Sequence, residues 1–341
     1  ENIDIQSPVE WIDSQDFTNT SNPYVGTYLG GNIIFAAGNS RSSGDNTNYH
    51  NFQNSRYVTT VGSTNKSGET SNFSTPGASI LVSAFGEGLV TTHLNGYTDS
   101  FDGTSAAAPL VSGVVALMLE ANPNLGYRDV QHILAYTSRQ ETDDNFKYNG
   151  AFNWNGGGLH ISHDQGFGLV DTHAAVRLSE SWDSVPLVSV NEKLVARRPE
   201  LEKPINIPDD DLGGVTVDTN IETDLNVEWA EVELHIRHDD ISDLVVELTS
   251  PSGTVARLID RPAFTGENPD IVKTGPYGYL PDRLIFNTSA SLFRGESSLG
   301  NWTLKVNDEL FGDEGQLREW GLKLYGSHSS DDNIYIYTDE Y

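Results

Sequence analysis

The chain has 341 residues and a formal net charge of −29 at pH 7, from 20 basic and 49 acidic side chains. Its length suits two domains, and its acidity argues against nucleic acid as a partner, because that binding needs a cationic surface. Cysteine is absent, so disulfides and thiolate metal sites are excluded. No uninterrupted stretch of about 18 apolar residues predicts a membrane span.

The first predicted element is an apolar run over residues 33–37 that ends in Gly38 and Asn39. The run is typical of a buried parallel strand, which leaves Asn39 exposed just past the carboxyl end. Ligands of open α/β sheets bind at that edge, and an amide there can donate a hydrogen bond to an oxyanion. A turn asparagine next to glycine is the alternative interpretation.

Two more strands are predicted at residues 57–63 and 80–83, and two helices at residues 110–120 and 127–137. The first helix is expected to bury one apolar face. This face consists of Val111, Val114, Val115, Leu117 and Met118.

Residues 103–109, with the sequence GTSAAAP, lead into the first of these helices. Pro109 is expected in the first turn, where N–H groups have no intrahelical acceptor. Those free N–H groups and the positive end of the helix dipole favour the negative charge that develops during acyl transfer. Ser105 is therefore a candidate nucleophile. An ordinary N-capping hydroxyl on a buried helix is the alternative.

Ser105 follows Asn39 by 66 residues, and the two motifs in this order resemble the subtilisin-like serine proteases. The resemblance implies an α/β fold with a parallel sheet and makes Ser105 the nucleophile. It implies an oxyanion hole formed by the side chain of Asn39 and the backbone N–H of Ser105. It also places Ala36, Ala37 and Gly38 along the bound substrate.

The family's catalytic triad comes in the order Asp, His and Ser, with the first two upstream of the oxyanion asparagine. The 38 residues before Asn39 contain no histidine, and without a base Ser105 is a weak nucleophile. We expect the missing Asp and His on a separate chain of a nicked protease or on a segment cut from this sequence, and the start at Glu1 fits processing. A pseudoprotease that keeps its fold for binding is the alternative.

Helical periodicity ends near residue 182, and residues 178–186 are interpreted as a linker. Short alternating or β-rich runs with turns between them then predict an antiparallel sandwich. The predicted strands are residues 227–236, 244–249, 255–259, 302–306 and 320–326.

Three segments of this second part resemble the P domain of the kexin and proprotein-convertase branch: residues 243–254, 300–304 and 315–326. The resemblance implies a jelly-roll sandwich that supports the protease domain and does no chemistry itself. The domains predicted are the C-terminal portion of a peptidase domain over 1–182, a P domain over 188–326 and a polar tail over 327–341.

Kexin-like enzymes cleave after basic residues because acidic groups line the pocket for the side chain that precedes the cut. In this chain His50 stands where one of those carboxylates is expected, and imidazole does not favour arginine or lysine. Asp45 matches a pocket carboxylate that can bind calcium, but the partner acid expected near Thr75 is absent. The basic preference and the pocket calcium therefore stay open.

Structural Ca²⁺ is the cofactor that the acidic loops favour, because it takes about six to eight oxygen ligands. The best candidate is the turn that contains Asp308 and Asp313, for which a solvated acidic turn is an equal alternative. Weaker candidates are residues 208–214 and the group Asp239, Asp240 and Asp243.

The sequence thus predicts a secreted, extracellular or periplasmic serine endopeptidase of the kexin type that forms an acyl-enzyme at Ser105. The expected partners are a protein or peptide substrate and a second polypeptide that carries the catalytic Asp and His. The rival prediction is a catalytically inactive protease fold that acts as a binding or scaffold protein.

Overall fold

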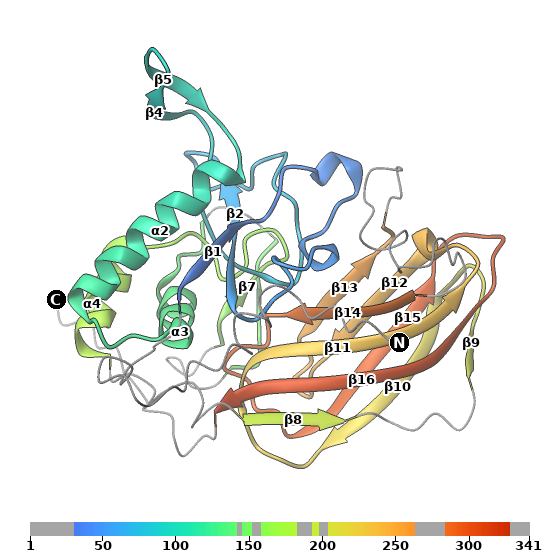
Figure 1. Cartoon of the computed structure of the whole chain (residues 1–341). Coiled ribbons are helices and arrows are strands. Elements are labelled where there is room, and N and C mark those ends of the chain that lie inside the picture. Colours follow the sequence, from blue (N-terminus) through green and yellow to red (C-terminus); the bar gives the residue numbers. More distant parts are fainter. Residues whose placement is uncertain are drawn as a thin grey trace, which may run out of the picture.

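The computed structural model describes residues 31–141, 145–151, 158–182, 193–197, 204–262 and 284–327. An α/β part comes first along the chain, and a β-sandwich follows and packs beside it (Figure 1). The predicted fold class, a parallel-sheet part followed by an all-β part, is confirmed.

A parallel sheet is the centre of the α/β part. Its strands are β1 (Ile33–Ala36), β2 (Val58–Thr64) and β3 (Ile80–Phe85), paired in that order. Every residue of β2 is buried, whereas β1 is only half-buried and Phe35 is 37% exposed. The first strand is therefore less buried than predicted, because β1 is the edge strand of the described sheet.

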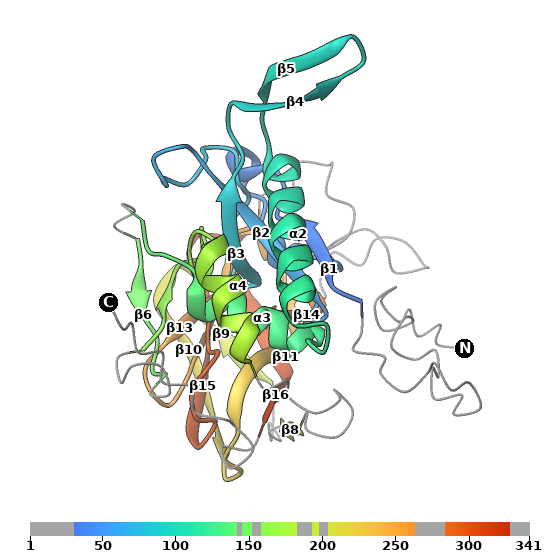
Figure 2. The same ribbon diagram turned by 90° about the vertical axis from the view of Figure 1, so that its left-hand side faces the viewer.

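Three helices accompany the sheet: α2 (Thr104–Ala121), α3 (Tyr127–Thr137) and α4 (Thr172–Ser181). Helix α2 contacts all three strands, and α4 packs against both α2 and α3 (Figure 2). The predicted inner face of α2 is buried except at Leu117, which is 46% exposed. Leu117 lies about 100° of helical rotation away from Met118 and so falls on the outer face.

Pro109 also lies differently from the prediction. It is the sixth residue of α2 and stands inside the helix rather than in its first turn. A proline there removes the N–H that would bond to the carbonyl four residues earlier, which is that of Ser105. The position is tolerated close to the helix start, where few preceding turns are disturbed.

Helix α2 is also long and apolar enough to cross a membrane by length and composition, with 18 residues and a mean hydropathy of 1.5. Its high hydropathy comes from valine, leucine and alanine, while Thr104, Ser112 and Glu120 interrupt the apolar run. Its packing on β1, β2 and β3 is that of a core helix.

The first half of the predicted linker is not a linker. Helix α4 begins after Asp171, whose side chain accepts from the Ala174 N–H at 2.9 Å, and it continues to Ser181. Trp182 then folds onto α3 and donates from Nε1 to Asp129 at 2.9 Å. Residues 183–186 lie outside the described residues, as do the opening stretch 1–30 and the tail beyond Ser327.

The smaller elements of the α/β part include a hairpin that projects from the body of the molecule (Figures 1 and 2). Its strands, β4 (Leu89–His93) and β5 (Gly96–Phe101), connect β3 to α2. The others are η1 (Arg41–Ser43), η2 (Thr47–Tyr49), β6 (Lys147–Tyr148) and β7 (His160–Ile161).

The sandwich consists of two antiparallel sheets. One has the order β10 (Asp211–Ile221), β15 (Gly300–Asp308), β12 (Leu244–Thr249) and β13 (Val255–Asp260). The other has the order β14 (Leu284–Ala290), β11 (Asn226–His238), β16 (Gly315–Ser327) and β8 (Lys193–Arg197), with β9 (Ile205–Ile207) also on β16. The five predicted strands are all present, and the longest additional strand among the described residues is β10, which the sequence analysis missed.

Buried polar groups join the sandwich to the α/β part. Asn48 donates from Nδ2 to Thr288 Oγ1 at 2.9 Å and to the Ser289 carbonyl at 2.6 Å. The Ser291 N–H donates to the Ala78 carbonyl at 3.0 Å. Tyr49 accepts from the Asp260 N–H at 3.0 Å. The loop after β1 is therefore held by β14 and by the end of β13.

Candidate active site

Asn39 reaches the site because the chain turns sharply at the end of β1. Gly38 has φ of 111°, a conformation that side chains disfavour. A Cβ at Gly38 would also lie 2.9 Å from Thr75 Oγ1. The Thr75 N–H donates to the Gly38 carbonyl at 2.9 Å, which fixes the turn and leaves Asn39 exposed.

Thr104 sets the orientation of the Asn39 amide. The backbone N–H and the hydroxyl of Thr104 both donate to Asn39 Oδ1, each at 2.9 Å. The hydroxyl also accepts from the Gly38 N–H at 3.1 Å. Because a backbone N–H can only donate, the atom that faces it must be the oxygen, and Nδ2 is left free to donate elsewhere. Asn39 Nδ2 has no acceptor among the described residues.

Ser105 lies at the second position of α2, where its side chain is exposed. The preceding Gly103 has φ of 129° and donates its N–H to the Gly86 carbonyl at 2.8 Å, so the helix start is anchored. A first-turn N–H such as that of Ser105 has no intrahelical acceptor. The backbone nitrogen of Ser105 and the amide nitrogen of Asn39 lie near each other, because a Cβ on Gly103 would be 3.7 Å from the first and 3.3 Å from the second.

A histidine partner for Ser105 is not present in the part of the chain that the structure describes. Ser105 Oγ makes no hydrogen bond there. The described histidines lie elsewhere, for example His132 on α3 and His163 against β13. The described residues therefore place an exposed serine hydroxyl near two N–H donors and provide no histidine partner for it.

His50 and Asp45 form a pair beside the end of β1. His50 Nε2 lies 2.9 Å and 3.1 Å from the two carboxylate oxygens of Asp45. Asp45 Oδ1 also accepts from the Asn46 N–H at 2.9 Å. Asp45 Oδ2 comes within 3.9 Å of the position that a Cβ on Gly38 would occupy, so the pair borders the expected substrate strand Ala36–Gly38.

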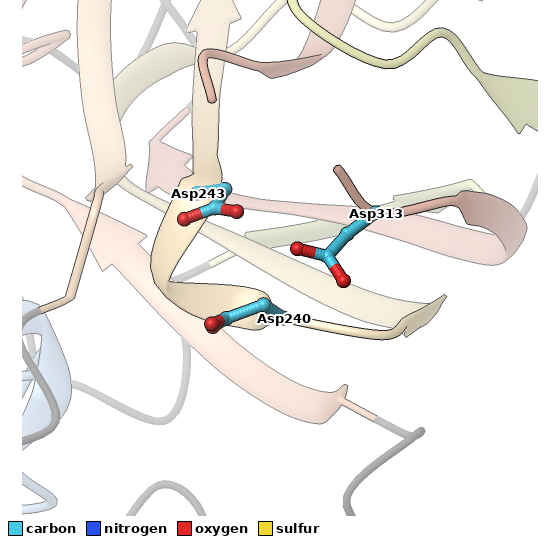
Figure 3. Close-up of side chains that lie close together, drawn as sticks. All are labelled: Asp240, Asp243 and Asp313. Carbon is cyan, nitrogen blue, oxygen red and sulfur yellow. The ribbon is translucent and has the colours of Figure 1, made fainter. Parts of the chain in front are cut away.

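The structure separates Asp308 from Asp313, although both were expected to bind metal in one turn. Asp313 joins Asp240 and Asp243, and carboxylate oxygens of the three lie within 4.8 Å of one another (Figure 3). Burial raises the pKa of Asp243, and the charges of Asp240, Asp308 and Asp313 raise it further. Such mutual repulsion is what a bound cation relieves.

Asp308 has other partners. Its carboxylate lies 3.2 Å from His238 Nε2, and both side chains are fully buried. Its other oxygen accepts from the Leu310 N–H at 3.1 Å. No local sequence pattern predicts this pairing or the meeting of Asp240 and Asp243 with Asp313, because about 70 residues separate the partners.

A parallel sheet whose edge carries an asparagine next to a helix-start serine, followed by a β-sandwich, defines the class of subtilisin-like peptidases with an appended P domain. Residues 10–168 match the subtilase family, and residues 227–324 match the proprotein convertase P-domain. The chain therefore belongs to the subtilase family, in the branch of kexin and the proprotein convertases.

Among its relatives, proprotein convertase subtilisin/kexin type 6 of Rattus norvegicus is 33% identical over 88% of this chain. Type 5 of Homo sapiens is 32% identical over 88% of the chain, and kexin of Saccharomyces cerevisiae is 30% identical over 86%. The chain spans only 32%, 16% and 35% of the lengths of these three relatives, respectively.

Solved structures show the same fold. The serine protease of Aeromonas sobria in its complex with a chaperone matches with a TM-score of 0.74, at 21% identity. That match covers 88% of this chain and 65% of the other. A second structure of the same protease matches with a TM-score of 0.71.

Proposed function

We propose that this chain is the nucleophile-bearing part of a serine endopeptidase that cleaves peptide bonds through an acyl-enzyme at Ser105. The observation that carries the proposal is the orientation of Asn39, whose oxygen is held by Thr104 so that Nδ2 donates outward next to the start of α2. Donors preset in this way stabilise the oxyanion of a tetrahedral intermediate.

The proposed chemistry follows from these positions. A base takes the proton of Ser105 Oγ as the oxygen attacks the scissile carbonyl, and the negative charge moves to the carbonyl oxygen. Asn39 Nδ2 and the Ser105 N–H donate to that oxygen. The leaving amine takes the proton from the base, and water then releases the acyl group by the same route.

The catalytic Asp and His come from a second segment, on a separate chain or upstream in a longer precursor. Exposed apolar side chains along α2 and on the edge strand β1 support this assignment. Leu110 and Leu117 on the outer face of α2 are 44% and 46% exposed, and Phe35 lies on the open edge of β1. A segment that adds to the sheet at β1 and covers α2 would bury all three and bring a histidine towards Ser105.

The substrate is a protein or peptide, with a weaker preference for a basic side chain before the cut than acidic pockets give. The support is the contact of both Asp45 oxygens with His50, which partly offsets the carboxylate charge when the imidazole is protonated. Localisation outside the cytoplasm, secreted or periplasmic, rests on the family resemblance alone.

Calcium is the proposed structural cofactor, held by Asp240, Asp243 and Asp313 at one end of the sandwich. Three carboxylates on loops fit its preference for several oxygen ligands. We expect calcium to raise the thermal midpoint of the natural chain and of D239N, whose exposed side chain lies outside the cluster, but not of D243N. Equal calcium responses in all three proteins would remove this assignment.

The main test is to determine the masses of the denatured components of the purified protein and to label it with a fluorophosphonate. If the proposal holds, we expect the masses to reveal a second polypeptide that carries the catalytic Asp and His. We also expect the fluorophosphonate to label Ser105 of the natural chain and not to label the S105A variant. N39A should fold and label about 10²–10³-fold more slowly, the loss known from subtilisin for one oxyanion donor.

The second candidate function is that of a scaffold, favoured by the lack of a hydrogen bond to Ser105 Oγ among the described residues. A single 37.3 kDa species that never takes the label, also after addition of the upstream part of the precursor, would support the scaffold and overturn the protease.

A further inference from the structure

Arg294 is buried between the α/β part and the sandwich. The residue is 1% exposed, and it follows β14 in a turn that faces α3. Its Nη2 donates to Gln131 Oε1 at 3.0 Å. Its Nε and Nη1 have no acceptor among the described residues. Burial lowers the pKa of Arg294, and the charge of Glu228 opposes this effect. A guanidinium stays protonated in proteins, so a buried positive charge has the amide oxygen of Gln131 as its hydrogen-bond acceptor among the described residues.

The nearby carboxylate, Glu228 on β11, is already engaged by Arg128. Arg128 Nε donates to Glu228 Oε2 at 2.8 Å, Arg128 Nη2 donates to Oε1, and His132 Nε2 lies 3.4 Å from Oε1. Burial raises the pKa of Glu228, but His132 and Arg128 outweigh it and hold the pKa well below its usual range. One carboxylate therefore balances two guanidinium groups and makes its hydrogen bonds to Arg128, so the buried charge of Arg294 is only partly offset, which is unfavourable in the interior.

A small cavity adjoins this charge. Its volume is about 10 Å³, roughly the space that one water-sized sphere needs. Arg294, Arg128 and Arg56 line it together with Trp229 and Glu228. The indole Nε1 of Trp229, in a residue 1% exposed, also has no acceptor among the described residues. Guanidinium and indole groups only donate hydrogen bonds, whereas the other lining residues carry acceptors; these are Glu228, Gln131, Tyr127 and Tyr325. With three guanidinium groups against one carboxylate, the lining has a net positive charge.

We propose that this cavity binds one small monovalent inorganic anion, and that the anion is chloride. A chloride ion accepts hydrogen bonds from several N–H groups and has no proton of its own to place, unlike water. The cavity is too small for a carboxylate or a phosphate. The bound ion supplies the remaining counter-charge for Arg294 and links α3 to β11 and to the turn after β14.

The first experiment measures the thermal midpoint of the full chain while sodium chloride replaces sodium gluconate at constant ionic strength. If chloride binds, we expect a saturable rise in the thermal midpoint, of about 2–3 °C when chloride is tenfold above its dissociation constant. R294M should lose the rise. R177M, which removes an exposed arginine on α4, should keep it and so accounts for general salt effects. The absence of a saturable rise, or an equal rise in R294M, would overturn the proposal.

The second experiment needs no variant and therefore holds even if R294M does not fold. Crystals of the natural chain are soaked in bromide, and anomalous scattering locates the ion. A bromide peak in the cavity within hydrogen-bonding distance of Arg294 supports the proposal. Density for water alone there, with no anomalous peak, overturns it.

Discussion

The hydroxyl of Thr104 performs two tasks at the proposed oxyanion hole. It donates to Asn39 Oδ1 at 2.9 Å and accepts from the Gly38 N–H at 3.1 Å, in a residue that is fully buried. The amide of Asn39 is thus oriented by a neighbour that itself touches no substrate. Sequence analysis identified Asn39 and Ser105 but assigned no role to Thr104, because a threonine before a serine has many uses at a helix start.

Thr104→Val keeps the shape of the side chain and removes the hydroxyl. We expect the free energy of unfolding to fall by about 0.5–1.5 kcal/mol, because the partly buried Gly38 N–H loses its acceptor. The rate of fluorophosphonate labelling at Ser105 should fall as well, since the Asn39 amide loses one of two restraints. Urea denaturation and labelling kinetics measure the two effects. Thr104→Ser keeps the hydroxyl and should behave like the natural chain. Equal losses of stability and labelling rate in Thr104→Ser and Thr104→Val would contradict this role.

At the scale of elements, the loop that carries Asp45 and His50 depends on the sandwich for its position. Asn48, fully buried at the centre of η2, donates to Thr288 Oγ1 and to the Ser289 carbonyl and accepts from the Ala78 N–H at 2.8 Å. One side chain thus connects the pocket loop, the segment before β3 and β14. If Asp45 and His50 border the substrate as proposed, a P domain that holds this loop influences the substrate pocket without contributing a catalytic residue.

Asn48→Ala leaves several buried groups without partners, each of which costs about 1–3 kcal/mol. We expect a loss of about 3 kcal/mol or more in urea denaturation, together with faster amide exchange in residues 46–54. Asn51→Ala, an exposed site on the same loop, is the control and should change stability by less than about 0.5 kcal/mol. Similar losses in the two variants would show that Asn48 does not hold the loop.

At the scale of the whole molecule, a histidine makes the contact between the two parts sensitive to pH. His163 Nε2 accepts from the Arg257 N–H of β13 at 2.8 Å, which requires a neutral ring nitrogen. Burial, together with the positive charges of Arg257 and Lys147, lowers the pKa of His163 from 6.5 to about 4, although the charge of Asp164 opposes this effect. The folded chain therefore binds this proton more weakly than the unfolded chain does.

The free energy of unfolding therefore falls as the pH falls. The stabilising effect of neutral His163 is complete above pH 6.5 and is lost as the pH falls towards 4, by up to about 3 kcal/mol at about 1.4 kcal/mol per pKa unit. His163→Gln keeps an acceptor and does not titrate. Unfolding free energies of both proteins between pH 7 and pH 4 test this: the natural chain should lose more stability than the variant, and parallel curves would refute it.

The sequence by itself determined the parts of this protein that consist of neighbouring residues. The strand ending in Gly38 and Asn39, the helix start at Ser105 and the alternating strand at 227–236 each depend on local backbone preferences and hydrophobic period, which a short segment encodes. The family followed from those same segments.

Only the tertiary structure decided how distant residues meet. It turned the Asn39 oxygen towards Thr104, brought Asp240 and Asp243 to Asp313, paired Asp308 with His238, and left Arg294 beside a cavity. None of these contacts has a local pattern, because the orientation of a side chain depends on hydrogen bonds and packing with segments tens of residues away. The same reason explains why the burial of Leu117 and of β1 was predicted wrongly. Whether a face is buried depends on the segments that pack against it, and the residues of that face do not encode those segments.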